Sequence, residues 1–217
     1  LDELQFPASH NFNALLFDEC PQIAARITAR GDEFVAHGRT NAERQDVYPE
    51  ADEARLIAET TEMFKRHAGV QPAGWMGPYF AHSPVTVDLL KEAGYRYILD
   101  WPADDQPFWM RTRSGPLLSV PYSIELNDSP TLVFRQEAAA SFERMMIDQF
   151  DELLLQSRKW PLVFTIVLHP FIIGQPFRLR ALRRALNHVA MMRDELWVTT
   201  PGAVATHFAG LVPAPVA

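Results

Sequence analysis

Three ionisable side chains each follow an apolar segment that is typical of a buried β-strand. His37 comes directly after residues 33–36, Asp100 after residues 95–99, and His169 after the run 163–168. Short apolar runs rich in β-branched residues predict strands of a parallel sheet that is buried on both faces. The C-terminal ends of parallel strands meet at one edge, where α/β enzymes place catalytic groups. We therefore predict that His37, Asp100 and His169 line one site.

These residue types suit acid–base chemistry. Imidazole titrates near neutral pH, so His37 and His169 are candidates for a general acid or base. Gly38 after the first histidine would let backbone or ligand approach closely. The carboxylate of Asp100 could orient a histidine or accept a hydrogen bond from substrate. The alternative is structural, with buried histidines bonded to backbone groups and Asp100 capping a loop.

A second group of residues lies beside these strand ends and could bind substrate. The indole of Trp101 would form an apolar wall next to Asp100, and Trp75 lies in a short strand flanked by glycines. Tryptophans are more often core residues, and the Asp104-Asp105 pair could simply be solvated. The candidates for substrate binding are Asn41, Trp75, Pro78, Trp101 and Asp105.

Other catalytic devices are absent from the sequence. Cys20 is the single cysteine, and no G-x-S-x-G motif is present to hold a nucleophilic serine. A zinc site needs about three protein ligands, and the residue one helical turn after His37 is Asn41, a poor ligand. No glycine-rich phosphate loop follows any predicted strand. We therefore expect no metal site and no cofactor.

Composition restricts the class of protein. A chain of 217 residues is long enough for one domain, residues 1–217, with a sizeable core. The net charge of −7 and the lack of a basic stripe argue against nucleic-acid binding. No apolar run has membrane-spanning length, and no signal-peptide pattern is visible in these residues. A lone cysteine cannot form an internal disulfide, which favours a reducing compartment, so we expect a cytoplasmic protein. We also expect its partner to be a small-molecule substrate.

Helix and strand signals alternate along the chain and predict an α/β fold with a parallel sheet, either open or closed as a barrel. The segment 102–116 shows no period and predicts a long loop. The start, Leu1-Asp-Glu-Leu, resembles the tail of a helix, which suggests a fragment or a processed product. The predicted helices span 21–30, 51–67, 84–93, 138–155 and 178–192, with a short one at the end. The predicted strands span 33–36, 95–99, 117–122, 163–168 and 196–199.

The order of the strand-end motifs resembles a known family. The matching segments are 30–41, 74–78, 90–101, 104–109 and 168–178. Taken together they resemble the polysaccharide deacetylase (NodB-homology) superfamily, and most of all its allantoinase-like branch. The resemblance implies a distorted (β/α)7 barrel that hydrolyses amide-type carbon–nitrogen bonds at its C-terminal mouth.

The chain departs from the family pattern on the metal side. The family's first strand, whose aspartate pair supplies a base and a metal ligand, has no match, so we expect the barrel to lack its N-terminal strand. The second histidine of the metal motif is Asn41, and Met76 replaces an arginine that orients the base. Asp100, Trp101 and the general acid His169 match. The resemblance therefore implies metal-independent or altered chemistry, with zinc only if residues before Leu1 supply ligands.

The sequence thus predicts a hydrolase of non-peptide carbon–nitrogen bonds in a small amide or ureide. His169 would protonate the leaving nitrogen or stabilise the tetrahedral intermediate, Asp100 would orient it or bind substrate, and His37 would position water or the carbonyl oxygen. One alternative is a zinc-dependent polysaccharide N-deacetylase of carbohydrate metabolism. The other is a non-catalytic binding protein. Because a missing strand would expose a sheet edge, we expect a homo-oligomer.

Overall fold

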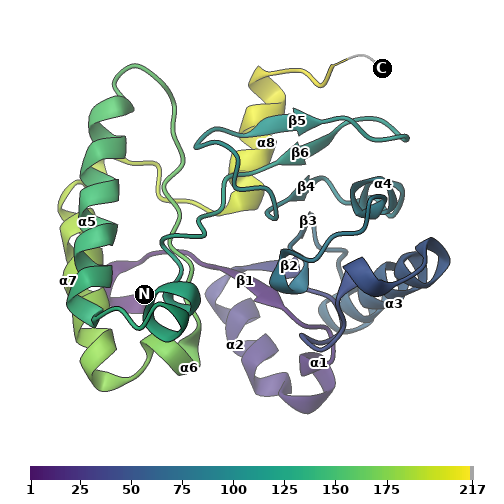
Figure 1. Ribbon diagram of the computed structural model, residues 1–217, viewed down its shortest axis with the longest axis horizontal. Helices are drawn as coiled ribbons and strands as arrows, with labels where there is room; N and C mark the ends of the chain where they lie inside the picture. The colour runs from purple at the N-terminus through teal and green to yellow at the C-terminus, as the bar shows by residue number, and fades with distance from the viewer. Residues whose placement is uncertain (216–217) are drawn as a thin grey trace.

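The structure is a computed structural model, and it describes residues 1–215. Its centre is a six-stranded sheet with the strand order β1-β2-β3-β4-β6-β5 (Figure 1). Strands β1 to β4 and β6 are parallel, and only β5 runs antiparallel, against β6. The strands are β1 (Ser9–Phe12), β2 (Glu33–Ala36), β3 (Gly74–Trp75), β4 (Tyr97–Ile98), β5 (Phe108–Met110) and β6 (Leu117–Ser119). The prediction of an α/β fold with a parallel sheet is confirmed.

The helices form three groups around the sheet (Figure 1). The first four helices follow the N-terminal strands, α5 packs against α7 to one side, and α8 lies near β5 and β6. They are α1 (Leu16–Glu19), α2 (Pro21–Arg30), α3 (Glu50–Ala68), α4 (Thr86–Glu92), α5 (Ala139–Gln156), α6 (Pro170–Ile173), α7 (Pro176–Met191) and α8 (Pro201–Leu211). Short helical turns lie at η1 (Asp2–Leu4), η2 (Gln45–Val47), η3 (Pro78–Phe80), η4 (Ser129–Phe134) and η5 (Arg193–Glu195). None of the helices within residues 1–215 combines the length and the hydrophobicity needed to cross a bilayer.

Local signals explain why the N-terminal elements begin and end where they do. Pro21 occupies the first turn of α2, where no backbone N–H is needed, and Gly31 ends the helix in the left-handed conformation with φ 69°. The predicted helix 21–30 and strand 33–36 are confirmed to the residue. Helix α3 carries acidic residues in its first turn and basic residues in its last, which complements the helix dipole.

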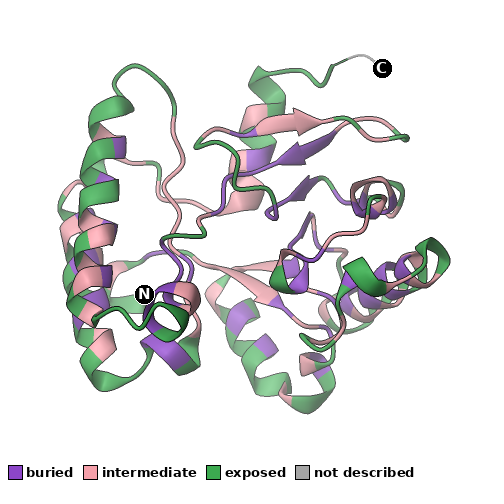
Figure 2. Ribbon diagram, in the orientation of Figure 1, coloured by how far each residue is buried: buried purple, intermediate pink, exposed green. Residues whose placement is uncertain are grey.

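The sheet separates two cores, because side chains alternate between its faces. Several strands of the sheet are coloured as buried in Figure 2. Phe12, Ala36 and Ile98 belong to the cluster that packs under the N-terminal helices. Val35 and Tyr97 belong to the opposite cluster, which α8 covers. A third core holds α5 against α7 through residues that include Phe142, Met146, Leu182 and Ala185.

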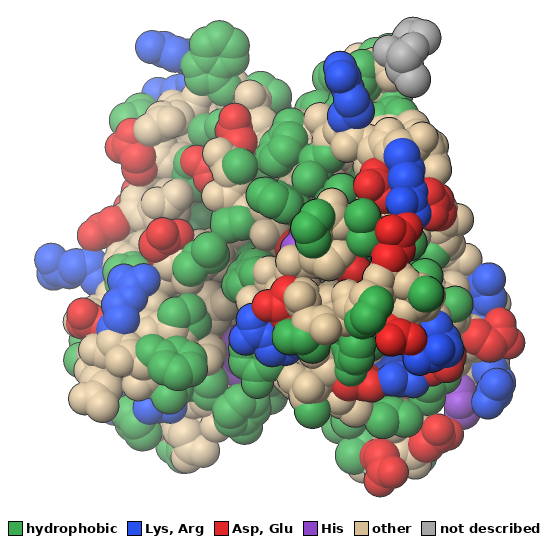
Figure 3. Space-filling view, turned by 45° about the vertical axis from the view of Figure 1, so that its right-hand side comes forward, with side chains coloured by type: hydrophobic (Ala, Val, Ile, Leu, Met, Phe, Trp, Pro, Cys, Tyr) green, Lys and Arg blue, Asp and Glu red, His purple; other side chains and the backbone are tan. Residues whose placement is uncertain are grey.

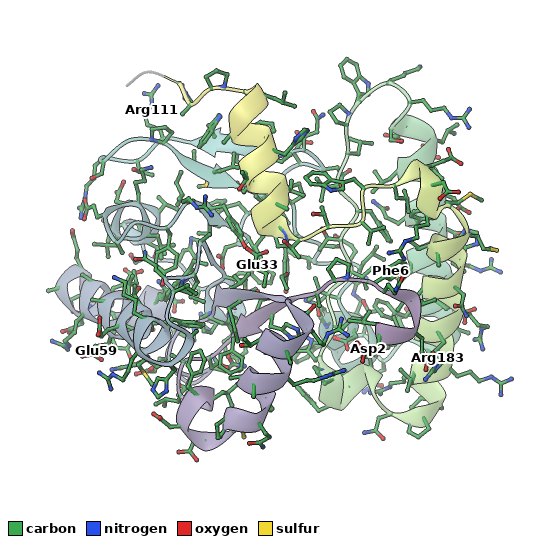
Figure 4. All side chains as sticks on the ribbon, turned by 180° about the vertical axis from the view of Figure 1, so that it is seen from behind. Asp2, Phe6, Glu33, Glu59, Arg111 and Arg183 are labelled. Atoms are coloured by element: carbon green, nitrogen blue, oxygen red, sulfur yellow. The ribbon has the colours of Figure 1, made fainter. Side chains whose placement is uncertain are left out.

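Glu33 anchors α8 to the start of β2 (Figure 4). Its carboxylate accepts hydrogen bonds from the backbone N–H of Gly202, at 2.9 Å, and from the Tyr97 hydroxyl, at 2.8 Å. An acidic group at the first turn of a helix is stabilised by the helix dipole. The contact holds the start of α8 at the N-terminal end of β2, whereas His37 follows the C-terminal end of the same strand.

Several predicted elements differ from the structure. The segments 163–168 and 196–199 run without a hydrogen-bonded ladder, and the bridge between Asn127 and Val167 is isolated. Strand β1 was not predicted, and β5 lies inside the predicted loop 102–116. Apolar, β-branched composition reports a buried extended segment but does not reveal whether a neighbouring strand shares its hydrogen bonds. Within residues 1–215, β1 and β5 form the two edges of the sheet, so β1 has one open side.

Candidate active site

The backbone ladder places the ends of β2, β3 and β4 side by side. Beyond the strands it continues through hydrogen bonds from His37 N to Phe12 O, from Met76 N to Ala36 O and from Leu99 N to Trp75 O. These bonds bring His37 and the residue after Leu99, Asp100, to the same edge of the sheet. These two residues therefore follow the C-terminal ends of β2 and β4, with β3 between them.

His37 is held in a form that can accept a proton. Its Nδ1 lies 2.5 Å from the carbonyl oxygen of Met76, which can only accept, so Nδ1 carries the hydrogen and Nε2 keeps its lone pair. Burial lowers the pKa of His37, the Met76 contact and the charge of Asp100 oppose that shift, and the charge of His169 adds to it. The imidazole is therefore neutral near pH 7, and the charges of Asp100 and His169 both act on it. The Asn13 amide, 2.5 Å from the His37 carbonyl oxygen, fixes the backbone at this point.

His169 pairs with a carboxylate that the sequence interpretation missed. Asp128 is fully buried, and its two oxygens accept hydrogen bonds from the backbone N–H of His169, at 2.8 Å, and from Nδ1, at 2.7 Å. The side chain of His169 is 38% exposed, so Nε2 is left to face substrate. A carboxylate that holds one imidazole nitrogen fixes the tautomer and orientation with which the other nitrogen transfers a proton. This pair can give a proton to a leaving group or take one from a nucleophile.

Little in the sequence around Asp128 indicates this role. The residue precedes Ser129-Pro130 at the start of η4, a context typical of a helix cap. The structure shows no side-chain cap hydrogen bond there, and the carboxylate reaches across to His169 instead. An aspartate at a helix N-cap position whose side chain does not bind that helix can be recognised only from the tertiary structure.

Asp100 makes different contacts from those predicted. Its Oδ1 accepts a hydrogen bond of 2.7 Å from Gly77 N and lies 3.3 Å from Nε2 of His82. Asp128, rather than Asp100, orients His169, which corrects that part of the prediction. Burial raises the pKa of Tyr122, and the charges of Asp100 and Asp128 raise it further.

The predicted substrate-binding residues are dispersed. Trp75 is wrong as a pocket wall, because it is fully buried in the core and donates a 3.0 Å hydrogen bond to Gln45. Trp101 is 44% exposed and packs edge-on against His82, with ring centroids 5.6 Å apart. Pro78 is buried over Gly38, whereas Asn41 and Asp105 are exposed.

A groove of about 620 Å³ adjoins this edge of the sheet. It lies between the loop that follows Trp101, helix α5 and the extended segment 163–165, and Tyr122 belongs to both the groove and the candidate site. Burial and then the charge of Asp104 raise the pKa of Asp105. The acidic residues along the groove are Asp104, Asp105, Glu125 and Asp148, and no basic residue lines it. On the face shown in Figure 3, hydrophobic side chains gather along the middle of the molecule, between its two lobes.

The residues that the structure describes do not fit a zinc ion. Within residues 1–215, no three His, Cys, Asp or Glu side chains gather in a way that could hold a metal. Nε2 of His37 is one available ligand, but Asn41 is exposed in the following turn.

Comparison with known proteins supports the family relationship. Residues 1–98 match the family described as polysaccharide deacetylase. The predicted relationship to the polysaccharide deacetylase superfamily is confirmed. A curated relative, the peptidoglycan deacetylase of Helicobacter pylori, is 23% identical over 205 residues, which cover 80% of this chain and 69% of that protein.

Two solved structures resemble the whole described domain. Puue allantoinase has a TM-score of 0.91 at 26% identity, with 99% of this chain and 71% of that chain covered. A probable polysaccharide deacetylase from Pseudomonas aeruginosa PAO1 has a TM-score of 0.89 at 27% identity, with 98% and 71% covered. These relationships place the chain among hydrolases of non-peptide carbon–nitrogen bonds.

Proposed function

We propose that the protein hydrolyses the amide of an N-acylated saccharide and releases the acyl group as a carboxylate. The observation that carries the proposal is the Asp128–His169 pair, which leaves Nε2 of the partly exposed His169 free, while the charge of His169 acts on the neutral imidazole of His37. The relatives named as deacetylases of peptidoglycan and polysaccharide support a saccharide as the substrate. This substrate class replaces the small ureide that the sequence suggested first.

The two histidines suit the two proton transfers of amide hydrolysis. A base near neutrality takes a proton from water as its oxygen attacks the carbonyl carbon. The lowered pKa of His37 and its free Nε2 suit this role. The tetrahedral intermediate then breaks its carbon–nitrogen bond, and the nitrogen takes a proton from Nε2 of His169, leaving an amine and a carboxylic acid. Asp128 holds His169 in place through both steps.

The groove fits this substrate class better than an anionic one. Its acidic lining repels negative charge, whereas the hydroxyl groups of a neutral sugar can donate hydrogen bonds to carboxylates. Its apolar members, such as Leu126 and Phe164, offer surface to a sugar ring. We infer that the saccharide chain runs along this groove and presents its acylated nitrogen to the histidines.

A second candidate is hydrolysis of a cyclic ureide. The similarity to Puue allantoinase extends over 99% of this chain and favours this class. The same two histidines would then act on a ring carbon–nitrogen bond. The two candidates differ in whether an acyl group is released.

The test is a direct assay with purified protein. Tri-N-acetylchitotriose and allantoin are incubated separately, and acetate release and ring opening are measured. Acetate release that is abolished by His169→Ala supports the proposal. The matched control is His188→Ala, because His188 also pairs with a carboxylate, Asp151, at 2.6 Å, but on helix α7 away from the site. Folded protein that opens allantoin and releases no acetate would favour the second candidate.

A further inference from the structure

Two neighbouring buried polar atoms, one of Asp100 and one of His82, have no hydrogen-bond partner among residues 1–215. They are Oδ2 of Asp100 and Nε2 of His82. The Asp100 side chain is 1% exposed and that of His82 is 11% exposed, so bulk water satisfies neither. The imidazole nitrogen lies 3.3 Å from the other oxygen, Oδ1, but the geometry is not that of a hydrogen bond. Because an unpaired buried polar group is costly, each such atom needs an explanation.

The loop that carries His82 is held in a strained conformation over Asp100. Tyr79 and Phe80 both have positive φ angles, 61° and 55°, which non-glycine residues rarely adopt. The Phe80 ring packs edge-on against Tyr122, with centroids 5.5 Å apart, and the backbone N–H of Gly77 donates to Asp100. Strain of this kind persists only where surrounding contacts enforce it, and it concentrates at functional sites.

We propose that Asp100 and His82 form a subsite for one hydroxyl group of the substrate, an inference that rests on the proposed function. A hydroxyl can donate its hydrogen to Oδ2 of Asp100 and accept one from Nε2–H of His82, so one group satisfies both atoms. A negatively charged group is disfavoured by the carboxylate. The subsite therefore selects a neutral, hydroxylated substrate and sets its register relative to His169.

Trp101 completes this subsite with an apolar wall. Its indole is 44% exposed and meets the His82 ring edge-on. Binding sites for small molecules combine aromatic walls with a few placed polar groups. The apolar face of a sugar ring lying on Trp101 would direct a ring hydroxyl towards Asp100 and His82. Simple amides without a hydroxyl lack this contact.

The test measures binding separately from turnover. Tri-N-acetylchitotriose is titrated by calorimetry into His169→Ala protein, which cannot complete hydrolysis, and into the same protein with His82→Ala added. We expect the dissociation constant to rise about tenfold, the effect of losing one hydrogen bond to a partly buried polar site. His67→Ala is the matched control, because His67 also lies near a carboxylate, Asp18 at 3.4 Å, and stacks on an aromatic ring, Phe17. That control should leave binding unchanged.

A second variant separates binding from folding. His82→Gln retains an N–H donor, and we expect it to bind more tightly than His82→Ala; thermal melting reports whether each variant is folded. The subsite is overturned if the His82→Ala substitution leaves the affinity unchanged in folded protein. It is also overturned if the protein that carries His169→Ala alone does not bind the saccharide. Binding that depends on His82 without acetate release from the wild-type chain would support the subsite and reject the proposed deacetylation. Acetate release with the same KM in wild-type and His82→Ala protein would support the proposed deacetylation and reject the subsite.

Discussion

The two histidines of the candidate site are held by two regions that are built differently. In the region 9–119, parallel strands share a continuous ladder, and His37 is fixed by backbone groups, the Phe12 and Met76 carbonyls. In the region 120–200 the extended segments have no ladder, and His169 is fixed by a side chain, Asp128. The first arrangement is set by the register of the sheet. The second depends on one residue, Asp128.

This difference has a consequence for how each region responds to substitution. A backbone carbonyl cannot be removed by mutation, so the orientation of His37 is lost only if the sheet is disturbed. The orientation of His169 can be removed by one substitution that leaves the core intact. Substitutions that disturb the backbone support of His37 should therefore lower stability, whereas removal of the Asp128 carboxylate should lower activity and leave the core intact.

The largest expected effect on stability separates the two tryptophans. Trp75→Ala removes a fully buried indole from the first region and should lower the free energy of unfolding by about 3–5 kcal/mol. Trp101→Ala removes a half-exposed ring and should change it by less than about 1 kcal/mol. Urea denaturation of both variants measures the difference. Equal losses would show that Trp101 is a core residue after all.

The next largest effect tests the side-chain support of His169. Asp128→Asn keeps the shape but removes the charge and one of the two acceptor oxygens, so the backbone N–H and the Nδ1–H of His169 can no longer both be accepted, and we expect kcat/KM to fall about 100-fold or more. The fold should survive, because asparagine has nearly the same size and shape and can still accept one hydrogen bond from His169. Acetate release from tri-N-acetylchitotriose, with circular dichroism as a check on folding, measures it. A full rate in the variant would remove Asp128 from the mechanism.

Hydrogen exchange should distinguish the ladder from the unpaired segment. Between residues 163 and 168, the backbone N–H groups with a backbone acceptor are those of Val163 and Val167. The amides of 164–166 should therefore exchange at least about tenfold faster than those of β2. Mass spectrometry of peptides spanning 161–169 and 32–38 measures both rates. Equal protection would mean that a ladder forms in the C-terminal region too.

The smallest effect is a pH dependence that arises from His37. Its pKa in the folded protein is lowered from the ordinary value of 6.5, so the unfolded chain takes up a proton first as pH falls. The contribution of neutral His37 to the free energy of unfolding is complete above about pH 6.5, and it is lost as pH falls through the pKa of His37 in the folded protein. The fall of kcat/KM on the acid side should likewise occur below about pH 6.5, because protonated His37 cannot act as a base. His37→Gln should flatten the stability profile, as measured by thermal melting between pH 5 and pH 8, a range of about 3 units around neutrality.

Much of the first region followed from local sequence. Helix α2 begins at its proline and ends at a glycine, and β2 follows with its histidine at the tip, as predicted. These features depend on residues adjacent in the chain, so local rules determine them. The short strand β1 escaped detection because His10 and Asn11 interrupt its apolar pattern.

The sequence by itself determined the α/β class, the main helices and the positions of His37, Asp100 and His169 in their segments. Only the tertiary structure decided which carboxylate serves which histidine, because Asp128 and His169 are 41 residues apart and no periodicity links them. The same holds for His82, which a loop brings to Asp100, and for Trp75, whose burial depends on helices packed over β3. Hydrogen-bond and packing partners distant in sequence are chosen by the fold as a whole, and a local pattern carries no record of them.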